Sequence, residues 1–179
     1  MEFMFGYPDK EGIYGSSGYL KTIDFGTTFD THNVKTMASM FDQCKEITSL
    51  DLSSWDTSNL TATVAMFACC YKLTDLNLKN WNTSKVTNMA AMFWECYVIK
   101  KIDLSSFDVS NVNNTPYPTR TIYYGLKWAF YRCLVLEEVI FGNHYKSDVD
   151  TTQMTYQCPE TLKITFLDEK IQATKRRKI

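Results

Sequence analysis

The chain has 179 residues, enough for one domain and hardly for two. Its hydrophobic share of 45% and charged share of 22% exclude a mainly disordered chain. A net charge of −1 argues against nucleic acid as a partner, and no apolar run is long enough to span a bilayer.

Residues 1–18 precede the first repeat and lack the basic stretch and long apolar run of a signal peptide. Either the chain stays inside a cell or virion, or an export signal has been removed from it. Four aromatic residues fall in this stretch: Phe3, Phe5, Tyr7 and Tyr14. Because a stack of repeats must cover its open ends, we expect residues 1–18 to form an N-terminal cap.

A repeat of about 26 residues occupies residues 19–160. Its three clearest copies are residues 47–58, 73–84 and 99–110. Successive copies begin at Leu20, Ile47, Leu73, Ile99 and Leu136, which are 27, 26, 26 and 37 residues apart. Self-similarity at such a period is typical of a solenoid, here of about five coils.

Each copy contains two segments with different apolar periods. Leu50 and Leu52 show the two-residue alternation of a half-buried strand. The second segment has the spacing of one helical face, with Thr83 or Ser84 as its N-cap: Val86, Met89, Met92, Phe93 and Cys96. We therefore predict an α/β repeat fold, a right-handed leucine-rich-repeat solenoid with a parallel sheet on one face and short helices on the other.

Written out, the repeat reads Leu-x-x-Leu-Asp-Leu-Ser-x-Trp/Phe-Asp-Thr-Ser-x-Val-x-x-Met-x-x-Met-Phe-x-x-Cys. This pattern resembles the repeat of the BspA-type leucine-rich surface proteins, which occur among bacterial adhesins and lipoproteins and some protozoan surface proteins. The resemblance covers residues 20–160. It implies a leucine-rich solenoid that is secreted or at a cell surface, and adhesion to host or neighbouring-cell proteins. The usual members carry a signal peptide, a lipobox or a wall anchor, which this sequence lacks.

Five of the six cysteines occupy one position of the repeat: Cys44, Cys70, Cys96, Cys133 and Cys158. A metal ladder or a disulfide framework is one interpretation, but no Cys-x-x-Cys or Cys–His cluster supplies converging ligands. We favour a small, polarizable side chain repeated on the buried face. The column is therefore predicted to be reduced and buried, with Cys69 facing the other way.

The two histidines, His32 and His144, belong to the first and fifth coils, on the order of 20 Å apart at the usual strand spacing. No set of nucleophile, base and orienting residue can be drawn around either of them, and the sequence has no glycine-rich phosphate loop. We therefore expect no catalytic residue, no cofactor and no metal site, and interpret both histidines as surface or corner residues.

Outward strand positions line the face that solenoids use for binding. One such position forms an acidic column: Asp24, Asp51, Asn77, Asp103 and Ile140. It could attract a cation or a basic partner, and we retain Asp51, Asn77 and Asp103 as candidate partner contacts. The favoured alternative is a solvated face on which Lys100 and Lys101 pair with Glu137 and Glu138 across one rung.

An insertion at about residues 113–122 lengthens a single coil, after which the apolar pattern resumes. We expect an outward loop with Tyr117, Arg120 and the adjacent Tyr124 as candidate partner contacts, because tyrosine and arginine are favoured interface anchors. Two prolines flank Tyr117 and limit the freedom of the loop. A neutral insertion is the alternative. We prefer the insertion to the acidic column as the contact surface, because the repeat itself dictates the column.

Residues 161–179 comprise a last strand over 162–166 and a basic tail over 175–178. We interpret the tail as a frayed, solubilising end, with a nuclear address or a phosphate contact as alternatives.

Taken together, these features predict a non-enzymatic binding or structural module that recognises a protein, or a glycan, as an adhesin-like unit or part of a surface or virion assembly. An intracellular interaction protein or effector is the alternative, and an enzyme is the third hypothesis.

Overall fold

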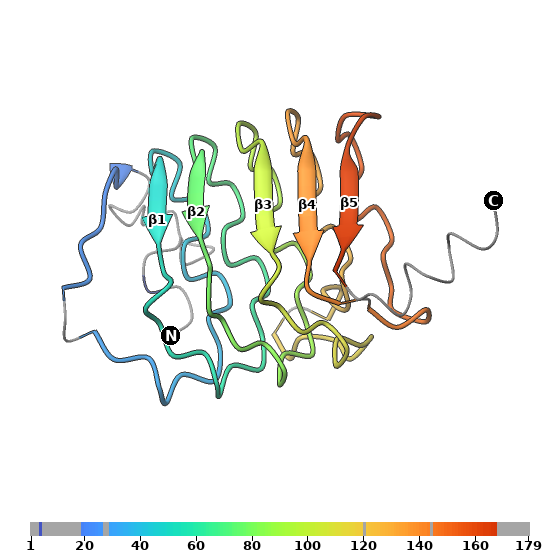
Figure 1. The fold of residues 1–179 in the computed structure, drawn as a ribbon, viewed down its shortest axis with the longest axis horizontal. Helices are drawn as coiled ribbons and strands as arrows, with labels where there is room; N and C mark the ends of the chain where they lie inside the picture. The colour runs from blue at the N-terminus through green and yellow to red at the C-terminus, as the bar shows by residue number, and fades with distance from the viewer. Residues whose placement is uncertain (1–3, 5–18, 27–28, 120, 144, 168–179) are drawn as a thin grey trace.

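The computed structural model describes residue 4 and residues 19–26, 29–119, 121–143 and 145–167. These residues wind into a stack of coils with five short strands along one side: β1 (Ser49–Asp51), β2 (Asp75–Asn77), β3 (Lys101–Leu104), β4 (Glu138–Phe141) and β5 (Lys163–Phe166). Figure 1 shows the strands in chain order, all pointing the same way. The predicted basic tail and nearly all of the predicted N-terminal cap lie outside the described residues.

Every strand pairing is parallel, as the solenoid prediction requires. Leu50 of β1 faces Leu76 of β2, so the step between paired strands equals the sequence repeat. Strand β5 pairs with β4 and confirms the strand expected at residues 162–166. Strands stacked at the period of the sequence establish a repeat architecture.

The first copy, which begins at Leu20, contains no strand among the described residues. Its apolar residues Leu20, Ile23 and Phe25 are partly buried and pack against the core.

The strands form two sheets: β1 pairs with β2, and β3, β4 and β5 pair in series. Within the described residues, β2 and β3 are not paired, and Figure 1 shows them visibly further apart than the paired neighbours. The burial of the apolar strand residues also changes at this place. Leu76 of β2 is partly exposed, whereas the others are buried: Leu50, Leu52, Leu78, Ile102 and Leu104.

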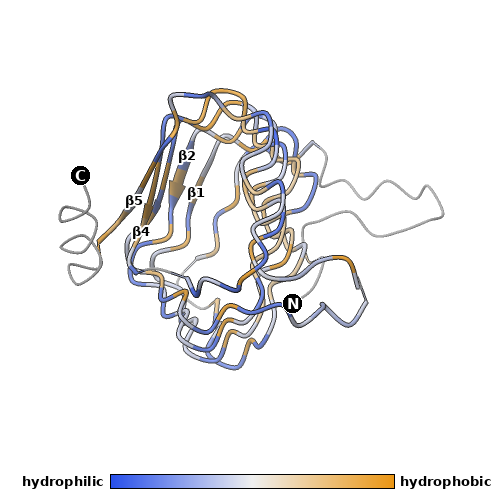
Figure 2. Ribbon diagram, turned by 90° about the vertical axis from the view of Figure 1, so that its right-hand side faces the viewer, coloured by the Kyte–Doolittle hydropathy of each residue, from blue (hydrophilic) through white to orange (hydrophobic). Residues whose placement is uncertain are grey.

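The wall opposite the strands holds no α-helix in the part of the chain that the structure describes, so the predicted rank of short helices is wrong. Figure 2 shows this wall facing the strands across the stack. It consists of runs of consecutive turns, called the turn segments below: residues 37–44, 63–70, 89–96, 126–133 and 151–158.

Within a turn segment, successive N–H groups alternate between two kinds of acceptor. In residues 63–70, three N–H groups donate to carbonyls of the next coil at 2.7 to 2.9 Å: Ala65, Phe67 and Cys69. The intervening N–H groups donate to carbonyls three residues back and close tight turns. Ala65 and Cys69 have positive φ angles of 52° and 58°, outside the range of a right-handed helix.

The apolar spacing correctly predicted which positions are buried, but it did not predict how the backbone is hydrogen-bonded. Met37, Met40, Phe41 and Cys44 are all buried. An α-helix donates its interior N–H groups to carbonyls of the same segment. This wall uses every second N–H to join one coil to the next, and side-chain spacing does not distinguish the two arrangements.

The predicted helix N-caps have a different role, for the same reason. Thr83 Oγ1 donates to the carbonyl of Asp108 at 3.0 Å and accepts from the Asp108 N–H at 2.8 Å. Thr57 Oγ1 accepts from the Asn82 N–H at 2.8 Å. These buried threonines therefore fasten one coil to the corner of the next.

Aromatic side chains stack in columns along the core. Phe41, Phe67, Phe93 and Phe130 lie with successive ring centroids 5.5 to 5.6 Å apart. A second column has spacings of 6.4 and 5.8 Å and contains Trp55, Trp81 and Phe107. Such stacking fixes the register between coils in addition to burying apolar surface.

Four members of the predicted cysteine column, Cys44, Cys70, Cys96 and Cys133, are buried, whereas the fifth, Cys158, is partly exposed; all six cysteines are free. Each thiol after the first donates to a phenylalanine carbonyl of the preceding coil, as Cys96 Sγ does to Phe67 at 3.2 Å. Burial raises the pKa of the Cys44 thiol to about 12 and that of Cys70 well above its usual value. Cys69 lies off the column and is partly exposed, as predicted.

Aspartate and asparagine end the strands and turn the corners by accepting the N–H two residues ahead. Asp56 Oδ1 accepts from Ser58 at 2.9 Å, and Asp108 Oδ1 accepts from Ser110 at 2.9 Å. Asn82 makes the equivalent bond to Ser84 at 3.1 Å. The hydrogen bonds from Ser58 and Ser110 lower the pKa of Asp56 and Asp108 respectively.

We predict that the protein loses stability in acid through these aspartates. Because their pKa values are lowered in the folded state, the unfolded chain takes up protons first as the pH falls. Their contribution is complete above the unfolded pKa and is lost as the pH falls from about 5 through the folded pKa. The measurement is the melting temperature at a series of pH values from about 7 down to about 2.5.

The control is the pair of variants Asp56→Asn and Asp108→Asn. Asparagine keeps the acceptor, as Asn82 does, but does not titrate. The double variant should therefore lose less stability between neutral and acid pH than the wild type. An acid profile identical to that of the wild type would contradict the assignment.

Candidate functional site

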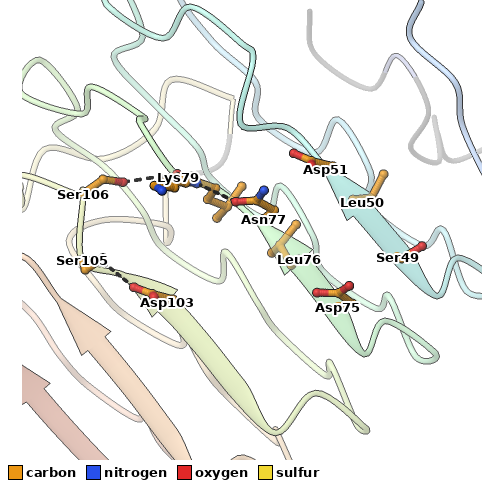
Figure 3. Close-up of a pocket in the computed structure, with 11 residues that line it drawn as sticks. Ser49, Leu50, Asp51, Asp75, Leu76, Asn77, Lys79, Asp103, Ser105 and Ser106 are labelled. Atoms are coloured by element: carbon orange, nitrogen blue, oxygen red, sulfur yellow. Dashed lines mark hydrogen bonds between the residues drawn. The ribbon is translucent and has the colours of Figure 1, made fainter.

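A cavity of about 660 Å³ lies on the sheet side, along β1 and β2 and reaching Asp103 of β3 at the missing β2–β3 pairing. Side chains and backbone of three successive coils line it: Ser49, Leu50, Asp51, Asp75, Leu76, Asn77, Leu78, Lys79, Asp103, Ser105 and Ser106. Figure 3 shows Asp75 and Leu76 on β2 and Asp103 on the neighbouring β3. We call this cavity the β2–β3 cleft.

The cleft is closed at one end. Beyond β2, Ser106 Oγ donates to the carbonyl of Leu78 at 3.2 Å and joins the two coils there. The turn segments of the same two coils also remain hydrogen-bonded, as from the Phe93 N–H to the Ala129 carbonyl at 2.8 Å. The two coils therefore separate only along their strands.

Backbone groups of both strands point into the cleft. Leu52 donates to Asn77 and Asp75 donates to Thr48, so Asp75 and Asn77 direct their backbone groups towards β1. Successive residues of a strand direct these groups to opposite sides. Leu76 therefore directs its N–H and C=O towards β3.

The same argument applied to β3 identifies the opposite rim. Glu138 donates to the carbonyl of Lys100 and Gly142 donates to that of Leu104, both across the β3–β4 pairing. Lys101 and Asp103 consequently direct their backbone groups towards β2. In a closed sheet the Leu76 N–H would donate to the Lys101 carbonyl, and the Asp103 N–H to the Leu76 carbonyl.

The cleft is acidic, with three carboxylates (Asp51, Asp75 and Asp103) and one ammonium group (Lys79) among its lining residues. A hydrogen bond from the Ser53 side chain lowers the pKa of Asp51, which keeps this carboxylate charged. Lys101, the cation on the β3 rim, pairs with Glu138 at 2.9 Å on the side away from the cleft. Among the described residues, no ion pair joins β2 to β3.

The structure brings together three of the predicted contacts, since Asp51, Asn77 and Asp103 all line the cleft. It also confirms the ion pairs of the solvated-face alternative, Lys100 with Glu137 at 3.1 Å and Lys101 with Glu138. Asp75 and Leu76 were not predicted as site residues. Asp75 and Lys101 occupy equivalent positions of neighbouring repeats, and an ion pair between them would favour a closed sheet. The sequence therefore gives no signal that β2 and β3 separate.

The insertion does not point outward as expected. Tyr117 is 9% exposed, and its Oη lies 3.1 Å from Oγ1 of Thr36, 81 residues earlier in the chain. Asn88 Nδ2 donates to the carbonyls of Thr115 and Tyr123 and so holds the two ends of the loop together. The loop thus folds back over the turn segments, because its aromatic side chain covers a patch of alanines there.

A second cavity of about 350 Å³ lies beneath this loop. Its lining is mostly small and uncharged: Lys35, Thr36, Thr61, Ala62, Thr87, Asn88, Thr115, Pro116, Tyr117 and Pro118. Tyr124 stands beside it, partly exposed, with Lys127 Nζ 4.8 Å from its ring centroid. Arg120 lies outside the described residues.

The predicted surface histidine is in place. His32 is exposed, with Nδ1 2.7 Å from the Asp30 carboxylate and Nε2 2.7 Å from Asn33 Nδ2. His144 lies outside the described residues. Within the described ranges, no three His, Cys, Asp or Glu residues are placed to hold a metal ion, and no helix is long and apolar enough to cross a membrane.

Parallel coils stacked at a regular sequence period define a repeat protein of the solenoid class. The model of the family described as "Mycoplasma protein of unknown function, DUF285" matches residues 14–120, more than half of the chain, and the chain belongs to this family. No curated protein and no solved structure matches it.

We predict that the amide of Leu76 exchanges with solvent faster than that of Leu52. The Leu52 N–H donates across the β1–β2 pairing at 2.9 Å, whereas Leu76 faces the cleft. Exchange is slowed by stable backbone pairing, so hydrogen–deuterium exchange resolved at these residues is the measurement. Equal protection of both amides would mean that the sheet is closed in solution.

The insertion gives a second prediction. Because Tyr117 is buried, we expect Tyr117→Ala to lower the free energy of unfolding by on the order of 3 kcal/mol. Tyr117→Phe keeps the ring and loses the hydroxyl that contacts Thr36, at a cost of about 1 kcal/mol. Urea denaturation of the two variants should give this order, and equal stabilities would contradict it.

Proposed function

We propose that this chain is a non-catalytic binding module that engages a protein partner through the β2–β3 cleft. One observation carries the proposal: a cavity of about 660 Å³ interrupts the sheet within a regular stack of coils. A solenoid presents its sheet as an extended surface for partners. An opening in that surface, lined by apolar, charged and hydrogen-bonding groups, has the character of a recognition site.

The composition of the cleft favours a protein over a glycan. Leu50, Leu76 and Leu78 supply apolar contacts, and the carboxylates favour a partner with basic side chains. Among the described residues, neighbouring rings cover part of the aromatic surface on which a sugar would stack. Tyr131, for example, lies against Trp94 and Tyr156, with centroids 5.2 and 5.1 Å away, so neighbouring rings cover its faces.

The resemblance to BspA-type surface repeats supports an adhesin-like role, in which the partner belongs to a host or neighbouring cell. An intracellular interaction protein or effector would use the same cleft. The folded-back insertion is a second candidate surface, because Pro116 and Pro118 are exposed on either side of the buried Tyr117.

The test is selection of binders from a displayed library of random linear peptides on the intact chain, followed by affinity measurements on two matched variants. Asp103→Lys reverses a charge at the cleft, and Asp24→Lys makes the same change in the first coil. Both aspartates accept the N–H two residues ahead, at 2.9 and 2.8 Å, so both variants lose the same local bond.

We expect Asp103→Lys to weaken the selected binders about tenfold or more, a loss of about 1.4 kcal/mol, and Asp24→Lys to have little effect. Melting curves of the two variants provide the control for folding. Equal weakening by both variants, binding that depends on residues 113–122 instead, or a selection that yields no binder would each count against the cleft.

A further inference from the structure

The β2–β3 cleft leaves backbone groups at positions where a strand would bond. By the alternation along each strand, they are the N–H and C=O of Leu76 on one rim, and those of Lys101 and Asp103 on the other. Among the described residues, β2 has β1 as its paired neighbour and β3 has β4. Because Lys101 and Asp103 are exposed, water reaches this edge of β3, and a peptide backbone would replace that water.

A backbone is the ligand that can reach both rims at once. Strands pair at about 4.8 Å, so one additional strand between β2 and β3 requires them to stand about 9.6 Å apart. At the closed end of the cleft, Ser106 Oγ donates to the Leu78 carbonyl, and beyond it Trp81 stacks on Phe107 with ring centroids 5.8 Å apart. Widening the cleft would break the Ser106 bond and loosen this end of the coils, whereas the turn segments on the far side of the coil would stay hydrogen-bonded.

Side chains of an inserted strand would alternate between two environments. Inward positions would meet Leu76 and Leu78 on one side and Ile102 on the other, which favour an apolar residue. Outward positions would meet Asp75 and Asp103, which favour lysine or arginine. The preferred sequence therefore alternates apolar and basic residues.

We infer that an extended peptide of alternating basic and apolar residues inserts between β2 and β3 as an additional strand. This inference rests on the proposed function and names the partner: an extended, positively charged segment of a protein, recognised mainly through its backbone. Strand addition at an open sheet position gives affinity through main-chain bonds and specificity through alternate side chains.

The probe is a short, labelled peptide of alternating lysine and valine, titrated into the intact chain by fluorescence anisotropy. Its matched control has identical side chains but carries N-methyl groups on alternate backbone nitrogens, which removes the N–H donors on one edge. A second control replaces lysine with glutamate. We expect each control to bind at least tenfold more weakly than the probe.

Two protein variants test the site. Asp75→Asn and Asp103→Asn remove one charge each while keeping an amide oxygen as acceptor, and the matched control is Asp24→Asn in the first coil. We expect the two cleft variants to weaken the probe severalfold and Asp24→Asn to leave its affinity unchanged. In hydrogen exchange, bound peptide should protect the amides of Leu76 and Asp103 and leave that of Leu52 as it was.

The outcomes separate this inference from the proposed function. If N-methylation has no effect while the cleft variants still weaken the probe, the cleft binds proteins but strand insertion is wrong. Library-selected binders that occupy the cleft without alternating basic residues would have the same meaning. Amides of Leu76 and Asp103 that are already protected in the free protein would show a closed sheet and overturn the inference.

Discussion

Backbone hydrogen bonds between successive coils hold this protein together, and the turn segments carry the longest unbroken series of them. From residues 37–44 to residues 126–133, alternate N–H groups donate to the next coil while the others close turns within their own. The arrangement places two residues of each turn segment at positive φ, among them Ala91 and Glu95 at 55° and 59°. That conformation costs on the order of 1 kcal/mol for a residue with a side chain. The inter-coil bonds and the burial of the columns offset this cost.

The sheet depends on that wall. Because the turn segments and the stacked rings set the spacing of the coils, one pair of strands can separate while the coils behind it stay joined. Strands β2 and β3 separate where Lys101 of β3 pairs with Glu138 of β4. Asp75 of β2 therefore lacks the cation that stands beside it in the repeat. An opening of this kind in an otherwise self-supporting sheet would expose a hazardous edge. Here it is short, acidic and tied at one end, which limits uncontrolled pairing.

The sequence was sufficient to predict the coils, their number, the parallel strands and the buried cysteine column, because each of these follows from apolar residues recurring at a fixed step. It was insufficient for the turn segments. The buried positions of Met89, Met92, Phe93 and Cys96 are the same whether the N–H groups bond within the coil or to the next one. Of the candidate site, Asp51, Asn77 and Asp103 were recognisable as outward strand residues. The cleft itself was not recognisable, because it depends on whether Lys101 pairs with Glu138 or with Asp75. Tyr117 was placed in the wrong environment because its contact, Thr36, is 81 residues away.

Because the acceptors alternate along a turn segment, the partner of each N–H group depends on whether its position in the segment is odd or even. Deleting one residue inside a segment would exchange odd and even positions. N–H groups that now bond the next coil would then point into their own turn, and those that now close turns would point towards the next coil. Such a change would disturb both neighbours along the stack. The 113–122 insertion avoids this, because it leaves the ladder at Asn113 and returns at Gly125, whose N–H bonds the Asn113 carbonyl at 2.9 Å. Related repeats should therefore differ in length at the corners by any number of residues, and within the turn segments only by even numbers of residues.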